Sequence, residues 1–318
     1  MEQKRVTPIT TAGCFAAIML ILALLSTYLP FFSFIGYFIM PIPMTILFVK
    51  YGLRQAVMLG VTAGILMGIF IDPLTAVVQI ATFGAVGIAM GAGFREKWPP
   101  AKLLMGVTAA LISTAIGLMA MMYAVMDVNI VAMLRDVFDT FMQEALQQYQ
   151  ASGMSEIQLA ETKAQLEEVR RQLPTMLPMF LCLSMAIIAY VNVKVSQFFL
   201  QRLGFDVRPF LPIRYWEMPR GVIYLYILAL VMKYWGTTRS IDWLNSIGLN
   251  LNQMAFFFIC IQGLAFLFYF LDRRFHISTG LQAVIIVLFF AMPVFSYAAF
   301  VMGLIDMLAN IRKKQNMT

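Results

Sequence analysis

The chain has 318 residues, of which 61% are hydrophobic and 12% charged, and its formal net charge is +7. Soluble domains average about 45–50% apolar and about 25% charged residues, so this composition excludes a water-soluble enzyme, a secreted disulfide scaffold and a disordered chain. A polytopic, all-α membrane protein remains. The single histidine, His276, and three widely spaced cysteines give no metal-ligand pattern, so no metal site is predicted.

Apolar runs in the N-terminal half predict five membrane helices, since roughly 20 apolar residues are needed to cross the hydrocarbon core. The runs cover residues 11–29, 34–49, 55–71, 74–94 and 102–126. Pro41 and Pro43 are expected to kink or break the second run, because proline removes a backbone donor. The pair Asp72-Pro73 is expected to end the third.

A long polar stretch, residues 127–172, separates the two halves. It has eight acidic and four basic side chains, and its apolar residues recur at helical spacing on either side of Gly153. Ser155 and Gln158 form a capping-box pattern at the start of its second part. This predicts an external, amphipathic helical hairpin, acting either as a lid on the bundle or as a docking or gating element.

The C-terminal half has further apolar runs at residues 175–203, 222–235, 251–271 and 278–308. Pro293 lies in the middle of the last, which is therefore one kinked helix or two short ones. About eight to ten membrane segments follow, with ten favoured. The expected organisation is a membrane half at 1–126, the hairpin at 127–172, and a second membrane half at 173–318 with a basic cytoplasmic loop at 204–220.

Basic residues predict the orientation. With the N-terminus inside, Lys4 and Arg5 and most other lysines and arginines fall in loops on the inner side, which satisfies the positive-inside rule. Lys313 and Lys314 place the C-terminus inside as well. The net positive charge therefore indicates contact with an anionic membrane leaflet and no nucleic-acid partner.

Small residues recur every four positions in three of the N-terminal helices. Such rows let helix backbones approach closely, which supplies packing energy in a bilayer. We expect the glycine set to serve helix packing; its members are Gly60, Gly64, Gly68, Gly87 and Gly91. For the second set, Ala12 and Ala16, we expect either internal packing or docking of a partner helix.

Few polar residues lie inside the apolar runs, and such residues tend to face a bundle interior or a cavity. Gln79 and Asn192 are candidate ligand-binding residues on this ground. Lys194 is close enough to a helix end to reach water. Asp306 is expected to form an ion pair with Arg312 or Arg274.

The basic loop at 204–220 alternates arginines with aromatic residues. Its side chains suit the membrane interface, a cytoplasmic docking site, or binding of a phosphate-bearing ligand. The candidate docking residues are Arg208, Arg214, Trp216 and Arg220. The sequence has no nucleotide-binding loop, nucleophile triad or carboxylate–histidine cluster, so neither enzymatic activity nor a cofactor is expected.

Several features together resemble the YybS-like family of bacterial polytopic membrane proteins. They are the Pro41-Ile42-Pro43 turn, Gly52 with Arg54, the glycine-rich third and fourth helices, the segments 211–219 and 262–274, and the ending 303–313. The resemblance covers nearly the whole chain. It implies a multi-pass protein of the bacterial cytoplasmic membrane.

The N-terminal half also resembles the substrate-binding subunits of energy-coupling-factor vitamin transporters. In those subunits an Ala-xxx-Ala row on the first helix docks a coupling subunit, and Ala12 and Ala16 match it. Their ligand lies under a loop between the first two helices, which implies Phe31, Phe34 and Tyr37 as ligand contacts here. We therefore expect a small-molecule-binding transporter subunit with separate coupling proteins; the alternative is a membrane scaffold or regulator that docks cytoplasmic partners.

Overall fold

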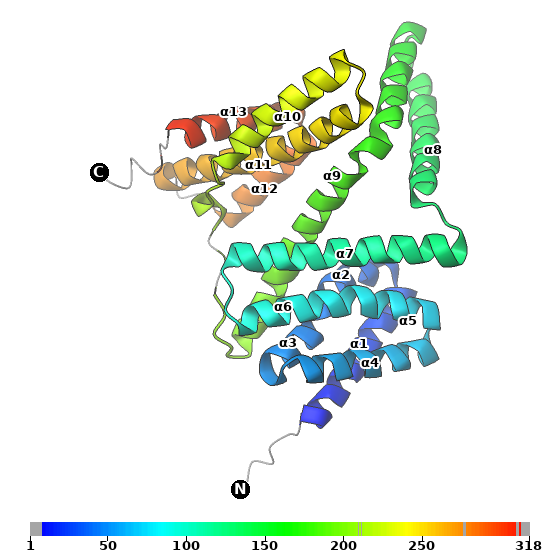
Figure 1. The fold of residues 1–318 in the computed structure, drawn as a ribbon, viewed down its shortest axis with the longest axis vertical. Coiled ribbons are helices and arrows are strands. Elements are labelled where there is room, and N and C mark those ends of the chain that lie inside the picture. Colours follow the sequence, from blue (N-terminus) through cyan, green and yellow to red (C-terminus); the bar gives the residue numbers. More distant parts are fainter. Residues whose placement is uncertain (1–7, 209, 211, 276–277, 310–311, 313–318) are drawn as a thin grey trace. The chain divides into compact units, whose positions relative to one another are not determined.

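The chain is all-α in the computed structural model, which describes residues 8–208, 210, 212–275, 278–309 and 312; no β-strand occurs among them (Figure 1). The terminal basic residues Lys4, Arg5, Lys313 and Lys314 lie outside the described residues. The chain forms two compact units. The N-terminal unit comprises Met1–Met154 and Leu181–Phe210, and the C-terminal unit comprises Ser155–Phe180 and Leu211–Thr318.

Within the described part of the chain, eight helices are long and apolar enough to cross a membrane, and a bent helix pair brings the number to nine. The pair is α12 (Thr279–Ala291) and α13 (Pro293–Ala309), which bend by 104°. The expected break at Pro293 is therefore confirmed. The architecture is that of an all-α polytopic membrane protein.

Four helices begin the N-terminal unit: α1 (Pro8–Tyr28), α2 (Pro30–Ile39), α3 (Pro41–Tyr51) and α4 (Leu53–Phe70). Proline occupies the first turn of α2 and of α3, where its missing N–H needs no intrahelical partner. The expected interruption at Pro41 is confirmed. α3 is buried along nearly its whole length and supplies Met44 and Leu47 to the core of the unit.

Gly52 ends α3 with a φ of 97°, a backbone conformation that side chains rarely adopt. The guanidinium of Arg95 lies over it, and a Cβ at Gly52 would be 2.5 Å from Nη1. The same nitrogen donates to the carbonyl of Phe48 at 3.5 Å. The ends of α3 and of the later helix α6 are therefore joined by a side chain that requires glycine beneath it.

The second part of the unit contains α5 (Pro73–Gln79), a π-helical turn (Ile80–Gly84), α6 (Ala85–Arg95) and α7 (Pro100–Met126). The side chain of Asp72 caps α5 by accepting the Thr75 N–H at 2.8 Å. The predicted break at Asp72-Pro73 is confirmed.

Glycines allow α6 to lie close against α3. A Cβ on Gly87 would be 2.9 Å from Cβ of Met44 and 3.0 Å from the Pro41 carbonyl oxygen, and one on Gly91 would overlap the ring of Phe48. Gly60 faces the end of the Met44 side chain, Gly64 faces Ile80, and Gly68 makes only ordinary contacts. Among the five glycines predicted to serve packing, Gly91 of α6 therefore makes the closest approach.

The polar stretch begins as α8 (Ile130–Ala151), in which no residue is buried. A turn at Gly153, with φ 81°, leads to α9 (Glu156–Arg202). The backbone N–H and the hydroxyl of Ser155 both donate to Oε1 of Gln158, and the Gln158 N–H donates to the Ser155 hydroxyl. The predicted capping box is therefore confirmed. The expected helix boundary between residues 172 and 175 is wrong, because α9 continues through Pro174 and Pro178.

The side chain of Asn250 supports α9 where these prolines interrupt its hydrogen bonding. Its Oδ1 accepts the Met179 N–H at 3.1 Å, and its Nδ2 donates to the Thr175 carbonyl at 2.7 Å. Proline lacks an N–H, so a helix that contains it needs partners from outside. Asn250, on a neighbouring helix of the C-terminal unit, therefore stabilises the turn of α9 that contains Pro178.

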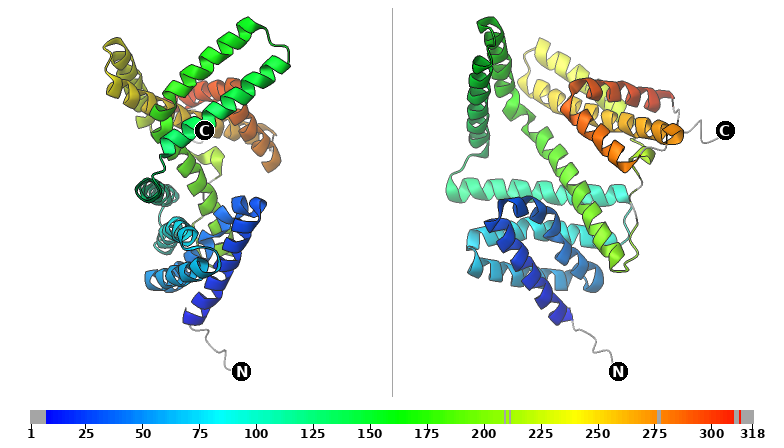
Figure 2. Two further views of the ribbon diagram at one scale, coloured as in Figure 1. Left: turned by 90° about the vertical axis from the view of Figure 1, so that its right-hand side faces the viewer. Right: turned by 180° about the vertical axis from the view of Figure 1, so that it is seen from behind.

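The C-terminal unit continues with a 3₁₀ turn (Ile213–Tyr215), α10 (Gly221–Thr238), α11 (Asp242–Phe275), α12 and α13. α11 packs along both α10 and α13, as Figure 2 shows. Glycines line both interfaces. A Cβ on Gly263 would overlap the Ala299 carbonyl oxygen, one on Gly303 would overlap the Ile259 carbonyl oxygen, and Gly248 meets the backbone of Lys233.

Candidate functional site

A polar cluster lies inside the C-terminal unit, where α11, α13 and the segment 212–220 meet. Gln262 of α11 is only 4% exposed. Its Oε1 accepts the Met218 N–H at 2.7 Å, which fixes the segment before α10 against α11. A buried amide needs partners for both its oxygen and its nitrogen, and the nitrogen is satisfied from α13.

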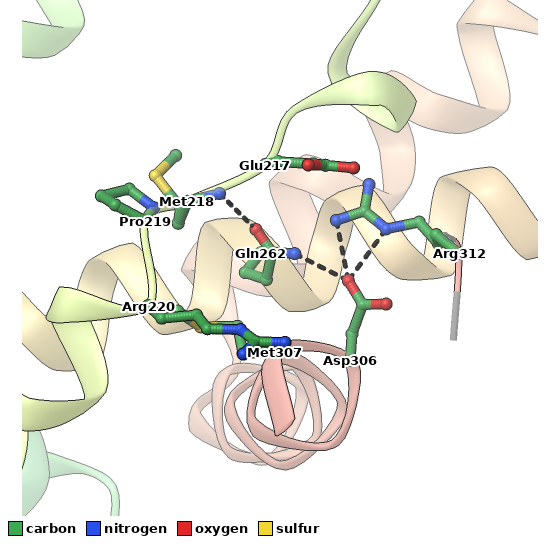
Figure 3. Close-up of a pocket in the computed structure, with 8 residues that line it drawn as sticks. All are labelled: Glu217, Met218, Pro219, Arg220, Gln262, Asp306, Met307 and Arg312. Atoms are coloured by element: carbon green, nitrogen blue, oxygen red, sulfur yellow. Dashed lines mark hydrogen bonds and ion pairs between the residues drawn. The ribbon is translucent and has the colours of Figure 1, made fainter. Parts of the chain in front are cut away.

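Asp306 of α13 is that second partner and is also 4% exposed. Its Oδ2 accepts from Nε2 of Gln262 at 2.6 Å and from Nε of Arg312 at 2.8 Å, and lies 2.7 Å from Nη2 of Arg312 (Figure 3). A charge this deeply buried requires a paired and hydrogen-bonded partner. The predicted ion pair of Asp306 is therefore confirmed, with Arg312 as the partner.

Arg312 extends this cluster to the loop. Its Nη1 donates to the Arg214 carbonyl at 3.0 Å, and the guanidinium of Arg214 forms an ion pair with Asp272 of α11. Nη2 of Arg312 is close to Asp306 but has no described acceptor in line with its N–H bonds. We interpret that contact as an electrostatic pairing, since the distance is short and the direction unsuitable for a hydrogen bond.

A cavity of about 340 Å³ opens beside the cluster. Figure 3 shows the side chains that surround it. They are Glu217, Met218, Pro219, Arg220, Gln262, Asp306, Met307 and Arg312. The volume falls within the range of small-molecule sites, which combine apolar walls with a few polar groups that fix orientation.

The groups around the cavity combine charged and apolar surface. The hydrogen bonds and ion pair of Asp306 hold it as a paired carboxylate, and the described part of the chain has no group of three or more metal-binding side chains. Met218, Pro219 and Met307 supply apolar surface, while Arg220 supplies a guanidinium. The arrangement can recognise a molecule that has both a charged and an apolar part.

The sequence-predicted ligand residues belong to the N-terminal unit, and none of them lines this cavity. Phe31 and Phe34 are 76% and 73% exposed. The Tyr37 ring packs edge-on against Phe83 of the π-helical turn, at 5.4 Å between centroids. This brings Tyr37 close to the turn that follows Gln79, but no hydrogen bond or ring contact of the described residues joins Phe31 or Phe34 to Gln79.

Asn192 is 1% exposed on α9, and its Nδ2 donates to the Ile188 carbonyl of the same helix at 3.1 Å. Its Oδ1 has no described hydrogen-bond partner, nor has the buried Oε1 of Gln79. Asn192 and Gln79 therefore each have a buried oxygen that could accept a hydrogen bond, but no contact among the described residues joins the two residues in one site. They remain separate candidates.

The predicted docking residues are similarly divided. Arg214 is engaged by Asp272, Trp216 is partly buried and has an interaction of its own, and Arg208 and Arg220 are exposed. The loop therefore does not present all four as one free surface. Arg214 stabilises the polar cluster, whereas Arg220 faces the cavity.

Of the two roles expected for Ala12 and Ala16, the contacts of α1 favour internal packing. Ala16 is 1% exposed and belongs to the core of the N-terminal unit, with Ala12 packed against the same cluster. α1 contacts α4 along this face. The small side chains permit internal packing, and the exposed face of α1 instead contains Gly13 and Ala17.

Sequence reasoning identified Asp306 as a polar residue in an apolar run but did not unite it with Gln262 and Arg220 in a cavity. The available signal was the cost of polar groups in a membrane. Sequence spacing does not show that positions 218, 262 and 306 meet, because they come from three different elements.

The helices and their apolar character define a polytopic α-helical membrane protein. Residues 17–307 match the family described as "Predicted membrane protein (DUF2232)", and the chain belongs to that family. It is 24% identical over 326 aligned positions to "Uncharacterized protein YybS" of Bacillus subtilis (strain 168), covering 98% of this chain and 99% of the relative. The expected YybS-like resemblance is thereby confirmed. No solved structure matches the chain.

Proposed function

We propose that this protein is a ligand-binding subunit of a membrane transporter and that the cavity of the C-terminal unit holds its small-molecule ligand. The observation that supports the proposal most strongly is the cavity itself, with its mixed lining beside a buried ion pair. Polar groups are costly in a membrane protein, and a fixed set around a cavity is typical of a ligand pathway.

The buried cluster suits this function because it holds the cavity wall in place. Gln262 and Arg312 fix the loop before α10 to α11 and α13 through Met218 and Arg214. A binding site needs such support so that its recognition groups are positioned before the ligand arrives. The chain has no nucleotide-binding motif, so energy for transport would come from separate coupling proteins.

The resemblance to energy-coupling-factor subunits motivates the transport class but not the position of the ligand. Phe31 and Phe34 lie exposed in the N-terminal unit, and Ala16 is packed internally. We therefore assign the ligand to the C-terminal cavity. A coupling partner would contact a surface other than the Ala12–Ala16 row.

The proposal is tested by native mass spectrometry of the full chain purified in lipid nanodiscs. We expect a non-covalent small molecule bound to the wild type and lost from Met218→Trp, which fills the cavity but keeps the backbone N–H that bonds Gln262. Met105→Trp, at a position 67% exposed on α7, is the matched control and should retain the molecule.

Equal occupancy in Met218→Trp and the wild type would exclude this cavity as the ligand site. The second candidate is a membrane scaffold, which the exposure of Arg208 favours. A scaffold would retain a cytoplasmic protein and no small molecule. Its partner would be lost from Arg208→Ala and kept by Met218→Trp.

A further inference from the structure

The cavity lining contains two acidic residues, Glu217 and Asp306, and two basic ones, Arg220 and Arg312. Asp306 is neutralised by Arg312 and hydrogen-bonded by Gln262, and Glu217 is already engaged in an interaction. Arg220 is exposed and lines the cavity, and its guanidinium forms no hydrogen bond or ion pair with the described residues. One guanidinium therefore remains available to a ligand.

Arg220 also stands at the N-terminus of α10, where it is the N-cap residue of an 18-residue helix. The positive end of a helix dipole and its unpaired N–H groups attract anions. The N–H groups of Val222 and Ile223 bond to the Pro219 and Arg220 carbonyls, so the first free donor of the helix is at Gly221. A Cβ on Gly221 would meet no atom within 4 Å, so the backbone is open there.

Apolar groups lie beside this positive end. Met218, Pro219 and Met307 line the same cavity, and Met307 is 4% exposed. Thioether side chains adapt to ligands of irregular shape. The cavity of about 340 Å³ holds a head group or a small metabolite rather than a whole lipid.

We infer that the ligand of this cavity bears a phosphate group, held by the guanidinium of Arg220 and the N-terminus of α10, with its carbon skeleton against Met218 and Met307. This rests on the proposed function. The planar guanidinium fork donates two parallel hydrogen bonds to phosphate oxygens, and the Gly221 N–H at the helix end adds one backbone donor. The phosphate belongs either to a soluble phosphomonoester or to a phospholipid head group.

The test measures binding to the full chain in nanodiscs. In the soluble arm, glycerol 3-phosphate is titrated into protein in phosphatidylcholine nanodiscs. In the lipid arm, native mass spectrometry follows retention of phosphatidylglycerol from mixed nanodiscs. We expect Arg220→Gln to weaken whichever arm binds by at least about tenfold, because a charge-assisted pair is lost. Arg220→Lys should be intermediate, since it keeps charge but not the fork.

Arg135→Gln, which removes an exposed arginine of α8 that is far in the sequence from the cavity lining, should bind as the wild type does. The inference is overturned if neither arm binds, if Arg220→Gln binds normally, or if succinate binds as tightly as glycerol 3-phosphate. If Met218→Trp displaces a native ligand that has no phosphate, the inference falls while the proposed function stands.

Discussion

Gln262 and Asp306 are joined by a buried hydrogen bond of 2.6 Å from Nε2 to Oδ2, although they are far apart in the sequence. The bond connects the middle of α11 to the C-terminal part of α13. Gln262 uses its other end to accept the Met218 N–H. A single amide therefore couples two packed helices to the loop that borders the cavity.

Replacing Asp306 with asparagine should strongly destabilise the protein. The substitution leaves the guanidinium of Arg312, which is 5% exposed, without its counter-charge. Removing one partner of a buried ion pair lowers the free energy of unfolding by about 3–5 kcal/mol. Thermal unfolding in detergent should show a large fall in Tm.

Two matched variants control this experiment. Asp206→Asn removes a carboxylate whose side chain is 85% exposed, and its Tm should match the wild type. The double variant Asp306→Asn with Arg312→Met should recover much of the loss, because no unpaired charge remains. A Tm of Asp306→Asn equal to that of Asp206→Asn would contradict the role assigned to the ion pair.

The Gly263 interface predicts a second destabilising change. Alanine at this position places a Cβ on the carbonyl oxygen of Ala299, so α11 and α13 must separate. Overpacking of this kind costs about 1–3 kcal/mol. Gly117→Ala in α7, where a Cβ meets nothing within 4 Å, should be neutral or slightly stabilising. Equal Tm values for the two variants would refute close packing at Gly263.

α1 offers a pair of neighbouring alanines that separates internal packing from partner docking. Ala16→Leu should lower Tm because the residue is 1% exposed against the core. Ala17→Leu, on the exposed face, should not. If Ala16→Leu instead left Tm unchanged and removed a co-purifying protein, the docking interpretation would be restored.

The ion pair of Lys97 with Asp206 predicts a small effect confined to acidic pH. The hydrogen bond from Lys97 lowers the pKa of Asp206 below its ordinary value of 3.8. A lowered pKa means that the stabilisation is present above the ordinary value and is lost as pH falls through the folded one. Any Tm difference between wild type and Asp206→Asn should therefore vanish on acidification. Because both side chains are exposed, that difference is small at neutral pH. A Tm difference that grew as the pH fell would contradict this assignment.

Local sequence signals predicted most of the helices. Pro41, Asp72 and Pro293 mark helix boundaries because proline and side-chain caps act within one turn. The same local reasoning failed at Pro174 and Pro178, where α9 continues and Asn250 from α11 bonds to the turn that contains Pro178. These bonds come from a residue more than 70 positions away, so no local pattern reveals them.

The sequence by itself determined the membrane class, since 61% hydrophobic residues cannot be covered by water-soluble packing. It also determined that Asp306 needs a cationic partner, because an unpaired buried charge is too costly. Only the tertiary structure decided that Arg312 is that partner, that Ala16 faces the core, and that Arg220 lines a cavity with Gln262. Each of these depends on which helix faces lie against each other, and side-chain packing across distant segments decides that.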